Sequence, residues 1–250
     1  MQIFDGDTTK VRQATGNIPG ANASLAAYLV AQRRYDEAAD VWKQIPADVR
    51  LSDFNEAGRS LVSVFRMAKQ FRHASDVFYD VSVGQRPPAG TVFDGGFESG
   101  VKVKDPGEFE WQIPGGSEPQ IAISTVQKHG GNSSLLLVFD TMETSDFRSL
   151  GQVVAVEPGA TYEFETYYRS ELKTPFTVRW EIADASNLGV IVAETAPVAA
   201  ISEWQPLRVK FSVPQTIDGI VFYIIRAGCQ SPVCPINGRL WFDDVSIRKL

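Results

Sequence analysis

Alternation of apolar and polar side chains is the pattern that most restricts the fold of this 250-residue chain. Three segments show it, with inward positions at Tyr162, Phe164, Thr166 and Tyr168, then Phe176, Val178, Trp180 and Ile182, then Leu207, Val209, Phe211 and Val213. Successive side chains of a strand point to opposite faces, so each segment predicts a half-buried antiparallel strand. Turn signals such as Pro106-Gly107 and Pro158-Gly159 separate further strand-length segments. We expect an antiparallel β-sandwich over residues 91–250.

Helical spacing replaces this alternation in the N-terminal third. It predicts two pairs of helices, with the first helix capped by Asn22 or Ser24, the second ending at Pro46 and the third capped by Ser52. The chain is therefore predicted to combine α and all-β domains. The expected divisions are an irregular lead-in at 1–21, helical repeats at 22–83, a proline-bearing linker at 84–90 and the sandwich at 91–250.

The helical segment contains an internal repeat, because Tyr35–Trp42 aligns with Phe71–Phe78 at a shift of 36 residues. The shift and the spacing of small and aromatic residues from Tyr28 to Pro46 resemble the tetratricopeptide repeat, whose period is about 34 residues. The resemblance implies helical hairpins that contact a protein partner. An ordinary four-helix cap is the alternative, since such arrays usually need about three repeats to be stable alone.

Charge and the length of the apolar runs argue against a nucleic-acid partner and against a membrane span. The net charge is −6, and 24 Lys and Arg are scattered among 30 Asp and Glu, so we expect no nucleic-acid partner. The longest apolar runs, such as Ile220–Ile225, are far shorter than the ~20 residues of a membrane span, so we expect no transmembrane segment. The first residues lack the basic and apolar regions of a signal peptide.

The outward positions of the predicted strands carry Tyr167, Arg169, Arg179 and Glu181. An aromatic ring offers a flat apolar surface to the C–H face of a pyranose, and Arg and Glu supply planar donors and acceptors for its hydroxyls. These residues therefore predict a sugar-binding face. A solvated face with cross-strand ion pairs, such as Arg179 with Glu181, is the alternative.

Seven motifs follow one another in the sandwich region: Gly96-Phe97-Glu98, Trp111, His129-Gly-Gly-Asn-Ser-Ser134-Leu, Gln152-x-Val154-x-Val156-x-Pro158-Gly159-x-x-Tyr162, Arg169-Ser170, Trp204 before Phe211-x-Val213-Pro214, and Trp241-Phe242-Asp243-Asp244-Val245. In this order they resemble the family 4/9/22 group of carbohydrate-binding modules. The resemblance implies a galactose-binding-like jelly roll that binds oligo- or polysaccharide without catalysis, in a cleft across a concave sheet. It places ligand contacts at Gln152, Tyr167 and Arg169, and Trp111 is the one tryptophan in a plausible loop.

The same resemblance implies a structural calcium ion near the first and last strands. Glu98 and Asp243 would be its carboxylate ligands, with backbone carbonyls around Lys128 to Gly130. The alternative for the Asp243-Asp244 pair is a bulge whose carboxylates accept hydrogen bonds from nearby backbone amides.

Two cysteines occur, Cys229 and Cys234, in a proline-bearing loop between two strands. We expect a disulfide across the loop, which implies a periplasmic or extracellular location. Two reduced thiols in a cytosolic protein, or a zinc site, are the alternatives.

The sequence contains no GxSxG, HExxH, Walker or GxGxxG motif, so we expect no enzyme. A glycosidase needs only two carboxylates, and Glu165 with Glu181 is the pair to consider. We expect a binding protein that recognises a glycan through the sandwich and a protein through the helices, in a role such as bacterial polysaccharide assembly or export. A structural scaffold without sugar binding is the alternative.

Overall fold

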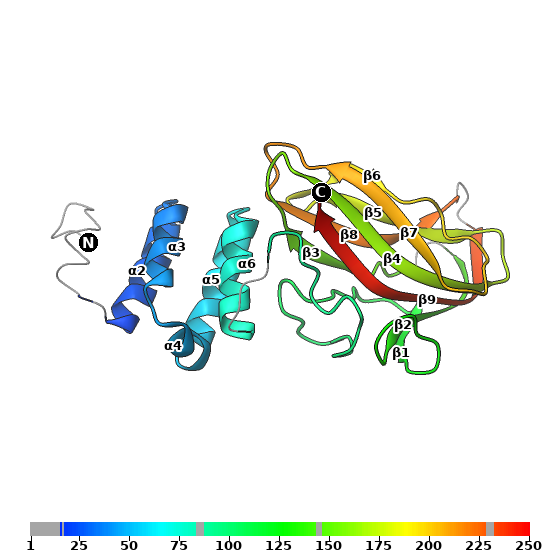
Figure 1. Ribbon diagram of the computed structural model, residues 1–250, viewed down its shortest axis with the longest axis horizontal. Coiled ribbons are helices and arrows are strands. Elements are labelled where there is room, and N and C mark those ends of the chain that lie inside the picture. Colours follow the sequence, from blue (N-terminus) through cyan, green and yellow to red (C-terminus); the bar gives the residue numbers. More distant parts are fainter. Residues whose placement is uncertain (1–15, 17, 84–87, 144–146, 229–232) are drawn as a thin grey trace. The chain divides into compact units, whose positions relative to one another are not determined.

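The computed structural model describes residue 16 and residues 18–83, 88–143, 147–228 and 233–250 (Figure 1). The chain divides into two compact units, Met1–Pro87 and Pro88–Leu250. The first is helical and the second consists of strands and loops. No helix in the described residues is long and apolar enough to span a membrane.

The helical unit contains five described helices: α2 (Pro19–Ala31), α3 (Tyr35–Lys43), α4 (Ala47–Ser52), α5 (Asn55–Met67) and α6 (Phe71–Ser82). Helix α2 packs on α3, and α5 packs on α6. The predicted caps are wrong. Helix α2 begins at Pro19, whose fixed φ suits the first helical turn, so Asn22 and Ser24 lie inside it. Ser52 ends the short helix α4, which the periodicity did not indicate.

The turn between paired helices is repeated. Arg33 and Lys69, 36 residues apart, both adopt φ of 59°. The next residue in each turn donates its N–H back to the preceding helix at 2.9 Å, from Arg34 to Leu29 O and from Gln70 to Phe65 O. These bonds satisfy carbonyls left open at the helix end. Two copies of one helical hairpin therefore follow each other.

The two hairpins are joined by buried contacts. Trp42 of α3 donates its indole N–H to Asp80 of α6 at 3.0 Å, and both side chains are buried. Gly58 of α5 lies against the same tryptophan, since a Cβ at this position would lie 3.1 Å from the Trp42 ring and 2.4 Å from Val81. Helix α5 can approach α3 and α6 this closely because residue 58 has no side chain.

The described residues of the second unit form nine strands: β1 (Gln120–Ser124), β2 (Ser134–Glu143), β3 (Gly151–Ala155), β4 (Thr161–Leu172), β5 (Thr177–Asp184), β6 (Asn187–Glu194), β7 (Gln205–Ser212), β8 (Gly219–Ala227) and β9 (Val233–Lys249). They form a five-stranded sheet, β1-β2-β9-β4-β7, and a four-stranded sheet, β3-β8-β5-β6. All strand pairs within the two sheets are antiparallel. The sandwich predicted from period-two alternation is confirmed.

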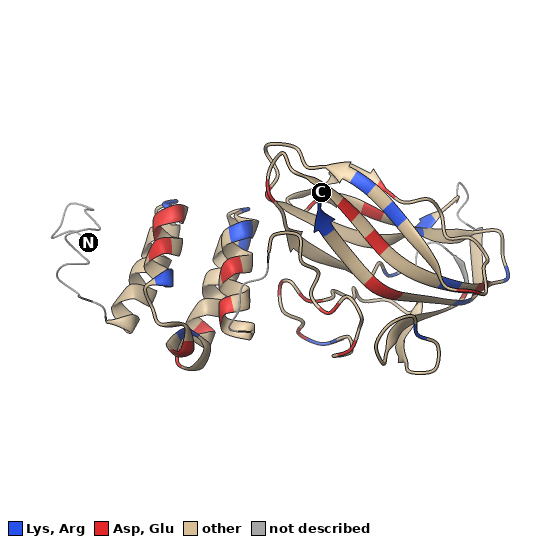
Figure 2. Cartoon of the chain, in the orientation of Figure 1, with Lys and Arg blue, Asp and Glu red and all other residues tan. Residues whose placement is uncertain are grey.

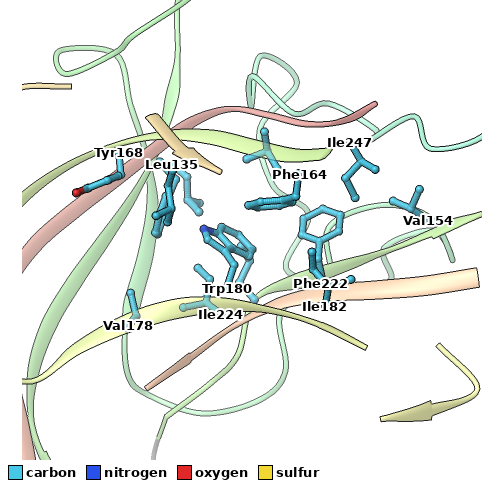
Figure 3. Packing of buried hydrophobic residues seen from close by; sticks show 14 of the residues in the cluster. Leu135, Val154, Phe164, Tyr168, Val178, Trp180, Ile182, Phe222, Ile224 and Ile247 are labelled. Atoms are coloured by element: carbon cyan, nitrogen blue, oxygen red, sulfur yellow. The ribbon is translucent and has the colours of Figure 1, made fainter. Parts of the chain in front are cut away.

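The core lies between the two sheets and is rich in aromatic rings (Figure 3). Trp180 of β5 lies 5.6 Å, between ring centroids, from both Phe164 of β4 and Phe222 of β8. All three side chains are fully buried. Removing one such ring costs about 3–5 kcal/mol of folding free energy, so these rings hold the sheets together. The inward side chains thereby decide which residues of each strand face outward.

One part of the outward face of the five-stranded sheet is covered by ion pairs (Figure 2). Glu163 of β4 lies between its cross-strand partners Lys210 of β7 and Arg248 of β9, and Glu165 pairs with Arg208 of β7. Opposite charges at directly facing positions stabilise neighbouring strands. This stretch of the face is therefore occupied by contacts within the protein.

Candidate functional site

A connected polar network lies on the outward face of the four-stranded sheet. Arg179 and Glu181 alternate in β5 with core residues, so they point away from the core. Tyr223 of β8 is the cross-strand partner of Glu181, and its hydroxyl donates a hydrogen bond to Glu181 Oε1. The sheet register therefore fixes a phenol ring beside a carboxylate on an open face.

Arg179 extends this network to the edge strand. Its guanidinium Nη2 lies 2.7 Å from Glu194 Oε2 of β6 and 3.9 Å from Glu181 Oε2. Its Nε is buried and has no hydrogen-bond partner among the described residues. Held between two carboxylates, the guanidinium is fixed in position.

The environment of Tyr223 raises the pKa of its phenol above the ordinary value of 10.0, first because the group is partly buried and then because it donates to the Glu181 carboxylate. The phenol is therefore neutral at physiological pH. Val221 and Ile225, two residues to either side in β8, are half-buried on the same face. The result is an aromatic ring flanked by aliphatic side chains, with planar polar groups beside it.

Tyr167 and Arg169 do not belong to this face. They lie in β4 of the five-stranded sheet, whereas Arg179 and Glu181 lie in β5 of the four-stranded sheet. Both pairs point away from the core, and hence in opposite directions. The expectation of one outward face carrying all four residues is wrong, because strands that follow each other in the sequence belong here to different sheets.

Each of the two β4 residues has its own aromatic neighbour. The Tyr167 ring stacks on His129 with centroids 3.7 Å apart and an interplanar angle of 12°. The Arg169 guanidinium lies 5.9 Å from the ring centroid of Trp241 and 3.3 Å from Glu171 Oε1. Both side chains are thus half-buried in contacts within the protein.

Two of the predicted ligand contacts are inside the unit. Gln152 is fully buried, and its amide accepts from Phe93 N at 2.8 Å and donates to Phe93 O at 2.9 Å. Trp111 is 2% exposed, stacks on Phe97 and donates its indole N–H to Asp94 O at 3.0 Å. Both predictions are corrected: these side chains hold the segment before β1 against the core and are closed to a ligand.

The predicted metal ligands lie where the segment before β1 meets β9. Glu98 Oε1 accepts from Asn132 N at 2.7 Å and from Ser133 N at 3.1 Å. These hydrogen bonds lower the pKa of the Glu98 carboxyl. Together with the N–H of Val245, which donates to Gly95 O at 2.9 Å, they join this segment to the 129–133 loop and to the end of β9.

Asp243 makes a similar contact from a buried position. Its Oδ2 accepts from His129 N at 2.8 Å and from Gly130 N at 3.1 Å, and its Oδ1 accepts from Asp244 N at 2.7 Å. Burial nevertheless raises the pKa of this carboxyl, against the lowering effect of the three N–H donors. The Asp243 carboxylate thus accepts hydrogen bonds from three backbone amides.

This arrangement does not form a cage of side-chain oxygens. In the part of the chain that the structure describes, no three His, Cys, Asp or Glu side chains gather in a way that could hold a metal ion. Calcium takes six to eight oxygen ligands, so a cation at Glu98 and Asp243 would need most of them from backbone carbonyls.

The family model described as a carbohydrate binding domain matches residues 89–228, which is more than half of the chain. The chain belongs to this family. The match begins just after the boundary between the two units, so the β-sandwich is the carbohydrate-binding domain. No curated protein matches the chain.

Several solved structures are similar to this chain at low identity. The CBM22-1 xylan-binding domain of Xyn10C from Paenibacillus barcinonensis is 16% identical, with a TM-score of 0.44 over 65% of this chain and 97% of that one. TmCBM61, solved with β-1,4-galactotriose, is 13% identical, with a TM-score of 0.44 over 64% and 99%. Tailspike protein 4 of bacteriophage CBA120 is 12% identical, with a TM-score of 0.47 over 65% of this chain but 22% of its own.

Two members of the polar network, Tyr223 and Glu194, were missed in the sequence. Tyr223 lies within the apolar run Ile220–Ile225, which shows no polar alternation because strand β8 is central and its outward neighbours are also apolar. The usable signal was the position of Tyr223 between Phe222 and Ile224, since both neighbours face the core. Glu194 ends an edge strand whose pairing with β5 is interrupted by bulges. The sequence therefore could not show to which side of the sheet its side chain points.

The predicted disulfide involves a residue outside the described part of the chain. Cys234 is fully buried in β9. Cys229 falls in the 229–232 gap, so the bridge stays a prediction.

Proposed function

We propose that the carbohydrate-binding domain binds a neutral oligo- or polysaccharide on the outward face of its four-stranded sheet. The observation that carries the proposal is the network of Tyr223, Glu181, Arg179 and Glu194. A phenol ring with aliphatic neighbours can stack on the C–H face of a pyranose. The guanidinium and carboxylates beside it can bond paired hydroxyls.

A neutral ligand follows from the charges of this face. The guanidinium of Arg179 contacts two carboxylates, Glu181 and Glu194, so the network has no uncompensated positive charge. A sugar carboxylate would meet two like charges here, whereas hydroxyl groups can donate to both Glu residues. The hydrogen-bonded network is fixed before binding, which lowers the entropy lost on association.

We assign binding without catalysis to this face. Glu165, the partner that the sequence suggested for Glu181, lies in β4 of the other sheet and pairs with Arg208. Two carboxylates on opposite faces cannot flank one glycosidic bond. Glu181 itself accepts the Tyr223 hydroxyl and faces Arg179, which suits a fixed acceptor better than a proton donor.

The two outward tyrosines provide the decisive experiment. The protein and its Tyr223→Ala and Tyr167→Ala variants are titrated with soluble xylo-, gluco- and galacto-oligosaccharides by calorimetry, with near-UV circular dichroism to check the fold. Tyr223→Ala is expected to weaken binding by about 1–3 kcal/mol, as for other aromatic anchors, and Tyr167→Ala to leave it unchanged. Loss of affinity in Tyr167→Ala alone would place the site on the other sheet. Absence of any binding, including to a wider glycan array, would favour the structural-scaffold alternative.

We further propose that the helical hairpins act as tetratricopeptide-like repeats that contact a protein. The repeated turn at Arg33 and Lys69 supports this, as does the spacing of 36 residues. Exposed apolar side chains on α5, Val64 at 43% and Met67 at 79%, offer contact area. A protein that pairs such repeats with a glycan-binding sandwich suits polysaccharide assembly or export. Co-purification of the chain with a protein partner checks this proposal. The double variant Val64→Glu, Met67→Glu should lose that partner.

A structural calcium ion between the Glu98 segment and the β9 segment is proposed separately. The carboxylates of Glu98 and Asp243 are acceptors with lone pairs beyond their present hydrogen bonds. The protein is stripped with excess chelator, and its melting temperature is compared with and without added calcium chloride. A rise with calcium that is absent in Glu98→Gln supports the ion, and identical melting curves contradict it.

A periplasmic or extracellular location is proposed on the basis of the expected bridge between Cys229 and Cys234. Mass spectrometry of the protein from its native compartment, before and after reduction, distinguishes a disulfide from two thiols.

A further inference from the structure

A groove of about 410 Å³ lies on the outward face of the five-stranded sheet, on the side opposite to the polar network of Tyr223. Its volume falls within the ~300–1,000 Å³ of small-molecule sites. The outward side chains that line it come from β2, β4 with the residue following it, and β9, and they are Val138, Asp140, Glu171, Lys173, Asn237 and Arg239.

The sheet register explains why these side chains meet. Arg239 of β9 is the direct cross-strand partner of Val138 on one side and of Glu171 on the other. One step along, Asn237 is the partner of Asp140, and its carbonyl accepts the N–H of Lys173 at 2.8 Å. Three neighbouring chain segments thus present alternate side chains to one hollow.

The two acidic side chains of the groove already have partners. Glu171 Oε1 lies 3.3 Å from the guanidinium of Arg169, and Asp140 Oδ1 accepts the Asn237 side-chain N–H at 3.2 Å. In contrast, the side chains of Lys173 and Arg239 make no hydrogen bond or ion pair with any described residue. Lys173 and Arg239 are therefore two cations without a hydrogen bond or ion pair among the described residues, and they share the groove with the carboxylates of Glu171 and Asp140.

We propose that this groove is a second saccharide site, and that it binds a sugar bearing a carboxylate, such as a hexuronate. The guanidinium of Arg239 presents parallel donors that match a carboxylate, and Lys173 adds a second positive charge. Asn237 and Asp140 can bond ring hydroxyls, and Val138 provides a small apolar contact for C–H groups. The inference goes beyond the neutral-glycan face and does not depend on it, because the two sites lie on opposite sheets.

The experiment uses a probe and its neutral counterpart. The full chain is titrated by calorimetry with trigalacturonate, with the fully methyl-esterified trimer and with inorganic phosphate. The acidic trimer is expected to bind at least about tenfold more tightly than its ester, and more tightly than phosphate, with an affinity that falls as salt is added. Equal affinity for trimer and ester would overturn the carboxylate assignment, and equal affinity for phosphate would overturn the saccharide assignment.

Variants locate the binding. Arg239→Gln and Lys173→Gln, singly and together, are expected to weaken binding of trigalacturonate about tenfold or more for the pair. Both side chains are exposed, so neither change disturbs the core. Arg208→Gln is the matched control, because Arg208 is a cation of the same sheet outside the groove. Unchanged affinity in the double variant, or no binding by the unaltered protein, would refute the site.

Tyr223→Ala separates this proposal from the neutral-glycan site. Retained trigalacturonate binding in this variant is expected. If Tyr223→Ala abolished it, the acidic sugar would bind on the four-stranded sheet and the groove assignment would fail.

Discussion

The hydroxyl of Tyr223 donates to the carboxylate of Glu181 across the β8–β5 pair, and these residues are direct cross-strand partners. This one bond joins a ring that can stack on a sugar to an acceptor that can bond its hydroxyls. It also helps to keep the phenol neutral, because partial burial and the bond to Glu181 raise the pKa of Tyr223.

The first prediction concerns alkaline titration. Partial burial and the bond to Glu181 raise the pKa of Tyr223 above the ordinary 10.0, so the folded phenol keeps its proton where an unfolded one ionises. The stability that this residue contributes is complete below the ordinary value and falls as pH rises above it. Absorbance at 295 nm during alkaline titration should show Tyr223 among the late tyrosines, together with Tyr79, because burial raises the pKa of Tyr79 to about 12. Glu181→Gln should move the ionisation of Tyr223 earlier, and an unchanged curve would contradict the assigned contact.

Acid stability depends on Glu163. Its side chain is 7% exposed, and the guanidinium of Arg248, with Nε at 3.2 Å, lowers the pKa of its carboxyl below the ordinary 4.5. The stabilising effect is present above 4.5 and is lost as pH falls through the lowered value. Urea unfolding of Glu163→Gln should show lower stability at neutral pH and a smaller loss on acidification than the unaltered protein. Identical pH profiles would show that the pair contributes nothing measurable.

The junction between the 129–130 loop and the end of β9 rests on Asp243. Its carboxylate is fully buried and accepts three backbone N–H groups, so Asp243→Ala would leave these donors without a partner. We expect a loss of about 3 kcal/mol in the unfolding free energy. Asp243→Asn, which keeps one acceptor oxygen, should lose less. The control is Asp140→Ala, at an exposed position, and an equal effect of the two alanine changes would contradict the role of Asp243.

The two helical hairpins should lose cooperativity without Asp80. This buried side chain accepts the Trp42 indole N–H and lies 3.4 Å from the Arg50 guanidinium. Asp80→Ala removes the acceptor of the Trp42 indole N–H and a charged group beside Arg50, with an expected cost of about 2–4 kcal/mol within this unit. Hydrogen exchange should accelerate in α3 and α6 while the strands of the sandwich keep their protection. Unchanged protection in α3 would show that Asp80 does not join the hairpins.

Much of the fold could be predicted because period two is a local property. Val178, Trp180 and Ile182 alternate with Thr177, Arg179 and Glu181, and this alternation alone assigns inward and outward faces. The repeat of helical hairpins was readable for the same reason, because Arg33 and Lys69 sit in matching surroundings 36 residues apart. The caps failed because Pro19 began the helix earlier than the polar residues indicated.

The site was predicted only in part. Alternation in the sequence showed that Arg179 and Glu181 point outward. Their partners could not be predicted, because Glu194 of β6 lies 13 residues after Glu181 and Tyr223 of β8 lies about 40 residues after it. Gln152 and Trp111 looked like ligand contacts because their residue types suit sugars, and burial against the core decides otherwise. The groove at Arg239 had no sequence signal, since it requires β2 and β4 to flank β9.

The sequence by itself determined that this chain forms strands with one apolar side, preceded by paired helices, because alternation and helical spacing depend on near neighbours. Only the tertiary structure decided which strands share a sheet, and therefore that Tyr167 and Arg179 point in opposite directions. The physical reason is that strand pairing is set by hydrogen bonds and core packing between residues far apart in the chain, and period-two alternation is satisfied equally well in either sheet.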